Sequence, residues 1–197
     1  MIRRDLIFRV NVSHLTNDHT SLLNSRIPWT INVESGYTEL SVHCFHEDTG
    51  QQLVKRTILG LSRDQDYIHF SPDVIQSLML TKKEGTSELN LNHLCSKIHE
   101  MCNDDKGSCY LDLVCNPLIK LICFTSEMSL VDNKTHYFIV SNNWNLKKVR
   151  QFISTIMPCG TFTNSSGVKL YDESKPIHSL DGVRFSFVKN DFPLKLT

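Results

Sequence analysis

Alternating apolar and polar positions predict a series of short strands in the first seventy residues. Leu40, Val42 and Cys44 alternate with polar side chains, which is the period-2 pattern of a half-buried strand. Turn-forming sequences such as Ser35-Gly36 separate the runs. The pattern predicts strands at residues 6–12, 29–33, 39–45, 52–59 and 66–70.

Two helices are predicted to follow these strands. Ser71 is a favourable N-cap, Pro72 suits the first helical position and Gly85 can end a helix, so residues 71–85 are predicted to be helical. A second helix is predicted within residues 88–102, because apolar side chains recur there at helical spacing. Its apolar face consists of Leu91, Leu94, Cys95, Ile98 and Cys102.

The second half of the chain returns to strands and adds one more helix. Residues 109–115 and 118–124 are predicted to form two strands joined around Asn116-Pro117, and residues 135–141 a third. An amphipathic helix is predicted at residues 146–157, followed by β-like runs at 168–172 and 183–188. The apolar face of this helix consists of Leu146, Val149, Phe152, Ile153, Ile156 and Met157.

This order of elements indicates an α+β protein. It favours a mainly antiparallel β-sandwich or barrel head with an inserted helical pair and a following packing helix. We expect residues 1–157 to form the globular head, including its closing helix. Residues 158–197 are then a C-terminal tail with β-like segments.

Composition and charge restrict the class of protein. The 197 residues are 40% hydrophobic and 21% charged, which is typical of a globular chain, and no apolar run is long enough to span a bilayer. No secretory signal is recognisable, so we expect the seven cysteines to be reduced thiols in an intracellular protein. Basic side chains predominate after residue 133, where the chain has 9 basic and 4 acidic residues.

Thiols and imidazoles gather in the stretch CSKIHEMCNDDKGSC. Cys95, His99 and Cys102 would share a helical face, and Cys109 could approach from the next turn to complete a tetrahedral zinc site. The alternative is a set of small buried cysteines with a solvent-facing histidine, which the spacing favours. His43 and His46 also lie close in sequence, but on a strand they would point to opposite faces.

No catalytic motif stands out, so we expect a protein that is not an enzyme. The sequence has no G-x-S-x-G, no phosphate-binding glycine loop and no His-Glu-x-x-His. The basic face of the 146–157 helix, formed by Lys147, Lys148 and Arg150, could contact phosphates or could simply be solvated.

Several stretches resemble the head domain of the XLF (Cernunnos) family of end-joining scaffold proteins. IPWTINVESGYTELSVHCF resembles the opening strand pair of that family, with its Pro28-Trp29. DYIHFSPDVIQSLM is similar to the strand that leads into the first head helix, and HYFIVSNNWNLKKVRQFISTIM to the last head strand and the helix after it. The resemblance covers about residues 25–157. The dimerising coiled-coil stalk is reduced or absent, because Pro158 and Gly160 follow the helix.

The resemblance implies a nuclear, non-catalytic scaffold of DNA double-strand break repair by non-homologous end joining, with no cofactor and no metal. The implied partners are the end-joining scaffold protein associated with DNA ligase IV, weakly bound double-stranded DNA, and Ku, because GVRFSFVKNDF resembles the family's Ku-binding peptide. Whether the chain forms a homodimer is left open. The implied sites are Leu130, Val131 and Lys134 for the partner, and Lys147, Lys148, Arg150, Lys189 and Lys195 for DNA.

The last third of the chain supports an alternative. A strand at 135–141, the helix, then VKLYDESKPI and VRFSFVKNDFPLKLT have the order of most of a ubiquitin-like β-grasp. This pattern is similar to the C-terminal domains of Polycomb ring-finger and deubiquitinase-activator proteins, and it implies an interaction adaptor of the ubiquitin pathway. The two alternatives differ in where the Leu146 face packs. A head domain would bury it against earlier strands and leave the tail peripheral, whereas a β-grasp would bury it against the tail.

Overall fold

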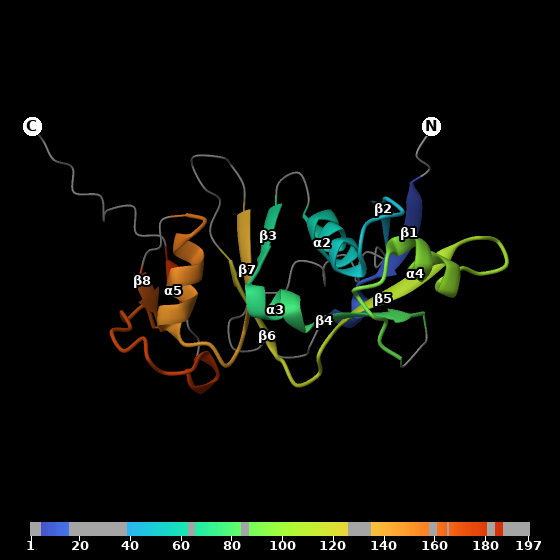
Figure 1. Ribbon diagram of the computed structural model, residues 1–197. Coiled ribbons are helices and arrows are strands. Elements are labelled where there is room, and N and C mark those ends of the chain that lie inside the picture. Colours follow the sequence, from blue (N-terminus) through green and yellow to red (C-terminus); the bar gives the residue numbers. More distant parts are fainter. Residues whose placement is uncertain are drawn as a thin grey trace, which may run out of the picture.

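Three open sheets and the helices packed on them make up the described part of the chain (Figure 1). The computed structural model describes residues 5–15, 39–62, 66–83, 87–125, 135–157, 161–164, 166–180 and 184–186. The protein is α+β, as expected, and its two larger sheets mix parallel and antiparallel pairs. Within the described residues no sheet closes into a barrel.

The first sheet has a parallel pair of strands at its centre. Its strand order is β2-β1-β5-β4, in which β1 and β5 run parallel while β2 and β4 run antiparallel to their neighbours. A parallel pair needs a long crossover connection, and here the chain between β1 and β5 supplies the helices that pack on the sheet. The strands are β1 (Leu6–Asn11), β2 (Glu39–Cys44), β4 (Leu78–Lys82) and β5 (Cys109–Cys115).

Helix α2 (Gly50–Leu61) occupies the segment where we predicted a strand at 52–59, so that prediction is wrong. The Thr49 side chain accepts a hydrogen bond from the Gln52 backbone, and the Gln52 side chain accepts one from the Thr49 backbone. This reciprocal capping box fixes the start of a helix. The buried side chains then follow helical spacing and pack on the first sheet, at Leu53, Val54, Thr57, Ile58 and Leu61.

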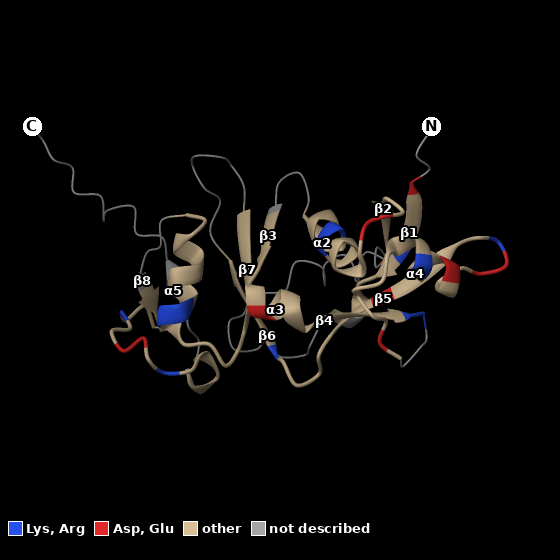
Figure 2. Ribbon diagram, in the orientation of Figure 1, with Lys and Arg blue, Asp and Glu red and all other residues tan. Residues whose placement is uncertain are grey.

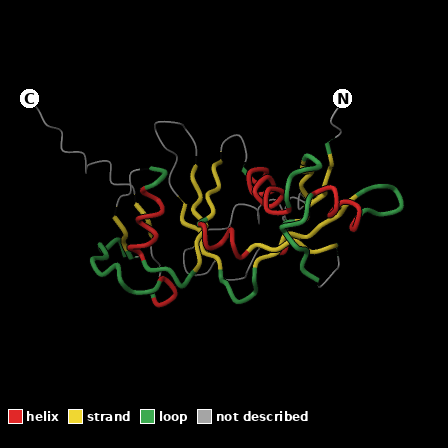
Figure 3. The backbone as a smooth tube through the Cα atoms, in the orientation of Figure 1, coloured by secondary structure: helices red, strands yellow, loops and turns green. Residues whose placement is uncertain are grey.

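The helix predicted at 71–85 is correct only for its first turns. Helix α3 (Pro72–Ser77) ends after six residues, and the chain continues as β4. The Leu78–Lys82 strand is held by five register pairs with β5, and tertiary pairing therefore overrides the helical pattern of the segment. The helix predicted within 88–102 is confirmed only for α4 (Cys95–Cys102), which covers the same face of the first sheet as α2 (Figure 3).

The second sheet combines an early strand with two later ones. Its order is β3-β7-β6, in which β3 runs parallel and β6 antiparallel to β7. The predicted hairpin of residues 109–115 with 118–124 is wrong, because β5 pairs in the first sheet and β6 in the second. The strands are β3 (Asp66–Phe70), β6 (Leu121–Thr125) and β7 (Thr135–Ser141).

The C-terminal segment encloses a second core. Helix α5 (Leu146–Ser154) buries Leu146, Val149 and Ile153 against side chains of β6 and β7 and against Phe162 and Ile177. Since Phe162 and Ile177 are fully buried, the expectation of a peripheral tail is wrong for these residues. The segment contains β8 (Thr161–Thr163), β9 (Arg184–Ser186) and a 3-10 turn, η3 (Ile177–Ser179). A second 3-10 turn, η1 (Ser13–Leu15), follows β1.

The second sheet lies between the two cores. Cys123 and Ile139 belong to the first core, while Phe124 and Phe138 on the same strands belong to the second. Alternation along each strand therefore places one face of the sheet against the first half of the molecule and the other against α5. In Figure 1 this sheet lies in the middle, with α5 and β8 on one side and the first sheet on the other.

Candidate interaction surfaces

The outward face of the first sheet is a candidate interaction surface, because both helices that pack on this sheet cover its other face. Because side chains alternate along a strand, the residues between the buried ones point to this outward face. The cross-strand neighbours on it are Ile7 with His43, Arg9 with Tyr110, and Met79 with Val114. We call this surface the outer sheet face. It consists of Ile7, Arg9, His43, Met79, Tyr110, Val114 and Lys83, which follows β4, and the same alternation places the buried Asp112 between Tyr110 and Val114.

Tyr110 lies at the centre of the outer sheet face, between two cations. The Arg9 guanidinium is 5.6 Å and the Lys83 ammonium 5.0 Å from the centroid of its ring. Arg9 also lies 3.7 Å from the Glu39 carboxylate. Each cation–π contact contributes about 0.5–1 kcal/mol at an exposed site, so both cations are held over the ring.

The outer sheet face combines these cations with exposed apolar area. Ile7 is 47% exposed, and Met79, Tyr110 and Val114 are half-buried. An aromatic ring with flanking cations suits an apolar partner segment that carries carboxylates. This arrangement can bind, but the described residues place no nucleophile with an adjacent base on it.

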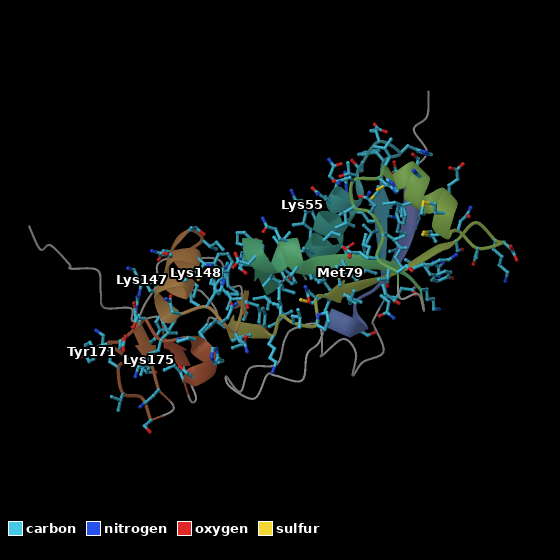
Figure 4. All side chains as sticks on the ribbon, turned by 60° about the horizontal axis from the view of Figure 1, so that its bottom comes forward. Lys55, Met79, Lys147, Lys148, Tyr171 and Lys175 are labelled. Carbon is cyan, nitrogen blue, oxygen red and sulfur yellow. The ribbon has the colours of Figure 1, made fainter. Side chains whose placement is uncertain are left out.

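Three of the predicted DNA-binding residues lie on α5, and Figure 4 shows Lys147 and Lys148 well away from Met79. Lys148 donates to Asp73 at 3.3 Å and lies 4.4 Å above the Trp144 ring. Arg150 donates to Glu173 at 3.0 and 3.2 Å. Two of the three basic side chains therefore have carboxylate partners within the chain. Lys147 is exposed, and Lys189 and Lys195 lie outside the described residues.

Two further lysines, Lys169 and Lys175, join this basic end of the chain (Figures 2 and 4). Sequence reasoning did not single them out, although they belong to the basic C-terminal third. Lys169 lies 5.4 Å from the centroid of Tyr171, which is 82% exposed. DNA contact through this surface stays a prediction.

Asp73 connects α3 to the second core. Its carboxylate accepts from the Trp144 indole N–H at 2.6 Å and from Lys148 at 3.3 Å. Burial would raise the pKa of this carboxyl, but the two hydrogen bonds and the lysine charge outweigh burial and lower the pKa below its ordinary value. The contact fixes α5 to the β3–α3 segment.

The zinc alternative for the thiol and imidazole cluster does not fit the described residues. Cys95, Cys102 and Cys109 are buried in the first core, whereas the His99 ring makes an edge contact with Phe8 at 5.5 Å. Across the described residues, no group of three or more potential ligands is placed to hold a metal ion. His43 lies on the outer sheet face and His46 in the turn after β2, so they do not form a chelating pair.

The predicted partner-binding residues Leu130, Val131 and Lys134 lie outside the described residues. The outer sheet face was missed at the sequence level. The sequence feature that could have indicated it is the set of residues that alternate with the buried ones in β1 and β5. Only the parallel pairing of these strands, however, brings Arg9 beside Tyr110.

Comparisons with known proteins add no family to this description. The chain matches no protein-family model, and a search of curated proteins finds no match. None of the helices in the described ranges is both long and apolar enough to cross a membrane.

Proposed function

We propose that this protein is a non-catalytic interaction adaptor of the ubiquitin pathway, built of two consecutive ubiquitin-like β-grasp units. The observation that carries the proposal is the topology of the first sheet. An antiparallel pair of β1 and β2, a helix across one face, and a final strand parallel to β1 in the order β2-β1-β5-β4 are the arrangement of a ubiquitin-like β-grasp.

The C-terminal half supports a second unit of the same kind. Antiparallel β6 and β7 are followed by α5 and then by the antiparallel pair β8 and β9, and β9 lies beside β6. The first unit has the same succession of strand pair, helix and closing strands, with β3, α3 and α4 inserted, whereas β8 and β9 form a two-stranded sheet of their own. Strand β3 adds to the free edge of β7 and joins the two units.

The mixed sheets favour this proposal over an end-joining head. The end-joining resemblance implied a mainly antiparallel sandwich, whereas β1 pairs with β5 and β3 with β7 in parallel. A scaffold role in end joining, with its nuclear location, DNA contact and ligase-associated partner, stays a prediction that rests on sequence resemblance alone.

The packing of the units indicates which surface recognises a partner. The second sheet is covered on both faces, by the first core and by α5. The first sheet is covered by helices on one face, so its outer sheet face is the surface we assign to partner binding.

The test is affinity capture with the full-length chain and with Tyr110→Ala, using Tyr171→Ala as the matched control. We expect the wild-type chain and Tyr171→Ala to enrich deubiquitinating enzymes or ubiquitin-ligase subunits at least tenfold over Tyr110→Ala. Enrichment of end-joining proteins instead, or equal enrichment by all three proteins, would overturn the proposal. Far-ultraviolet circular dichroism of each variant checks that the fold is retained.

A further inference from the structure

Four buried thiols surround α4 in two pairs. Cys95 begins the helix and lies within hydrogen-bonding reach of Cys44 at the end of β2. Cys102 ends the helix and lies within hydrogen-bonding reach of Cys109 at the start of β5. Each end of α4 therefore meets one strand of the first sheet through a pair of sulfur atoms.

The backbone brings the end of α4 against the start of β5. Asn103, directly after Cys102, forms an isolated antiparallel bridge with Cys109. Nearer the turn, the Asp104 N–H donates a hydrogen bond of 2.8 Å to the Ser108 carbonyl. This tight turn keeps the end of α4 against the start of β5, which places Cys102 directly beside the residue that pairs with Cys109.

Cys102 is also the most accessible of the four thiols. It is 5% exposed, whereas the other three are at most 1% exposed. It is the last residue of the helix, and an exposed stretch of the chain at residues 103–107 follows it. Helix ends fray, so a small reagent reaches Cys102 by local opening of one turn.

The surroundings of Cys102 favour its reactive form. A hydrogen bond from Cys109 lowers the pKa of Cys102 to about 7, and the Lys82 charge makes a smaller contribution in the same direction. Together these two effects outweigh burial, which would raise the pKa. The same interaction raises the pKa of Cys109. The thiolate is the attacking species in thiol–disulfide exchange. Because Cys102 is also the more exposed of the two, we assign it as the attacking sulfur and Cys109 as the resolving one.

We propose that Cys102 and Cys109 form a reversible disulfide, and that this pair is a modification site for small disulfides such as glutathione disulfide. The Cys102 thiolate attacks one sulfur of the reagent, forms a mixed disulfide and releases one glutathione thiolate. The Cys109 thiol, after loss of its proton to solvent, attacks the Cys102 sulfur and releases the second glutathione. The two protein thiols are oxidised, and one glutathione disulfide is reduced to two glutathione molecules.

The other cysteines provide internal comparisons. Cys44 and Cys95 make a similar contact but are 1% and 0% exposed. Burial raises the pKa of Cys123 to about 12. Cys115 is 8% exposed, but burial raises the pKa of its thiol and its side-chain contact is with the Ser77 hydroxyl. We therefore expect oxidation at moderate reagent concentration to form the Cys102–Cys109 disulfide.

The experiment treats the full-length chain with glutathione disulfide, alkylates the remaining thiols in denaturant and maps the peptides by mass spectrometry. We expect Cys102 linked to Cys109, with Cys44, Cys95 and Cys123 alkylated. The rate of loss of free thiol should rise with pH, because the thiolate is the attacking species. A link between Cys44 and Cys95 alone, or complete alkylation of Cys102 and Cys109, would overturn the proposal.

Two variants separate the attacking sulfur from the resolving one. Cys109→Ser should accumulate a glutathione adduct on Cys102, and Cys102→Ser should leave Cys109 alkylated. Cys123→Ser, the matched control, should form the disulfide at the wild-type rate. Equal rates of modification in Cys102→Ser and in the wild type would contradict the assigned order of attack.

Discussion

The rings of His69 and His136 stack in the sheet that separates the two cores. The centroids of the two rings are 5.2 Å apart, and His69 Nε2 lies 3.0 Å from His136 Nδ1. Phe138 stacks on His69 at 5.1 Å and on His136 at 6.3 Å, so the three rings form one cluster. Burial, followed by the charge of His136, lowers the pKa of His69 to about 4.

This depressed pKa predicts a loss of stability in mild acid. The folded protein binds the His69 proton only near pH 4, whereas the unfolded chain binds it below its ordinary pKa of 6.5. Between pH 6.5 and pH 4, unfolding is therefore accompanied by uptake of a proton on His69. The contribution of neutral His69 to the unfolding free energy is fully present above pH 6.5 and is lost as the pH falls toward 4. The loss amounts to about 1 kcal/mol at pH 5, once solvent screening is allowed for.

Urea unfolding at pH 7 and pH 5 measures this effect in the wild type and in His69→Phe. The phenylalanine retains an aromatic stack but cannot take up a proton, so its stability should change less between the two values. His43→Gln, at an exposed position on β2, serves as the control and should follow the wild type. An identical pH dependence in His69→Phe and the wild type would remove His69 as the cause.

The start of α2 depends on a close approach of two backbones. Gly50 donates to the His93 carbonyl at 3.0 Å, and Gln51 donates to the Leu91 carbonyl at 3.1 Å. A Cβ atom at Gly50 would lie 2.8 Å from Leu91 Cα, whereas one at Gly60 would lie 3.7 Å from Leu40 Cδ1. The same substitution therefore has opposite consequences at the two ends of one helix.

We expect Gly50→Ala to destabilise the protein by about 1–3 kcal/mol, because a backbone neighbour must move. Gly60→Ala should stabilise it by about 0.5–1 kcal/mol, because alanine lowers the entropy of the unfolded chain at a position with room for a methyl group. Chemical denaturation of both variants measures the difference. Equal effects of the two substitutions would contradict the close packing of α2 against the 91–93 segment.

The C-terminal segment supplies part of the second core. The Phe162 ring is fully buried, 6.0 Å from the Phe124 ring of β6 and 5.0 Å from the Arg150 guanidinium. Phe162→Ala should cost about 3–4 kcal/mol of unfolding free energy. Tyr171→Ala, in the same segment but 82% exposed, should change it by about 0.5 kcal/mol or less. A cost for Phe162→Ala as small as that for Tyr171→Ala would show that the tail is peripheral after all.

Local signals in the sequence predicted some elements and missed others for identifiable reasons. The predicted strands at 109–115 and 135–141 match β5 and β7, because their apolar runs and flanking turns are local features. Helix α2 was mistaken for a strand because Val54, Thr57 and Ile58 are β-branched, while the capping box at Thr49 and Gln52 was overlooked.

The pairing of strands could not be predicted from local patterns. β1 meets β5 across about one hundred residues, and β3 meets β7 across about seventy, so no turn sets either register. The same limit applies to the outer sheet face, because Arg9 and Tyr110 become neighbours only through the β1–β5 pair. The basic face of α5 was visible in sequence, but its ion pairs with Asp73 and Glu173 were not.

The whole molecule is interlocked by the β3–α3 segment. β3 lies in the chain between α2 and β4 of the first unit, yet it pairs with β7 over five register positions of the second sheet. Ser71, directly after β3, donates to the Ile139 carbonyl at 2.9 Å, and Asp73 accepts from the Trp144 indole. If the β3–α3 segment unfolds together with the first unit, the second unit loses all of these contacts.

The interlocking predicts that damage to the first core lowers the stability of the second. Leu53 on α2 is fully buried in the first core, and Leu53→Ala should cost about 2–5 kcal/mol. In a Trp29→Phe background, Trp144 is the single tryptophan and its fluorescence reports the second core. Leu53→Ala should shift the urea midpoint seen by Trp144 as far as the midpoint seen by far-ultraviolet circular dichroism, because cooperative units unfold together. If the Trp144 midpoint stayed in place while the circular dichroism midpoint moved, the two units would be thermodynamically independent, and β3 would be an added edge strand that the second core does not need.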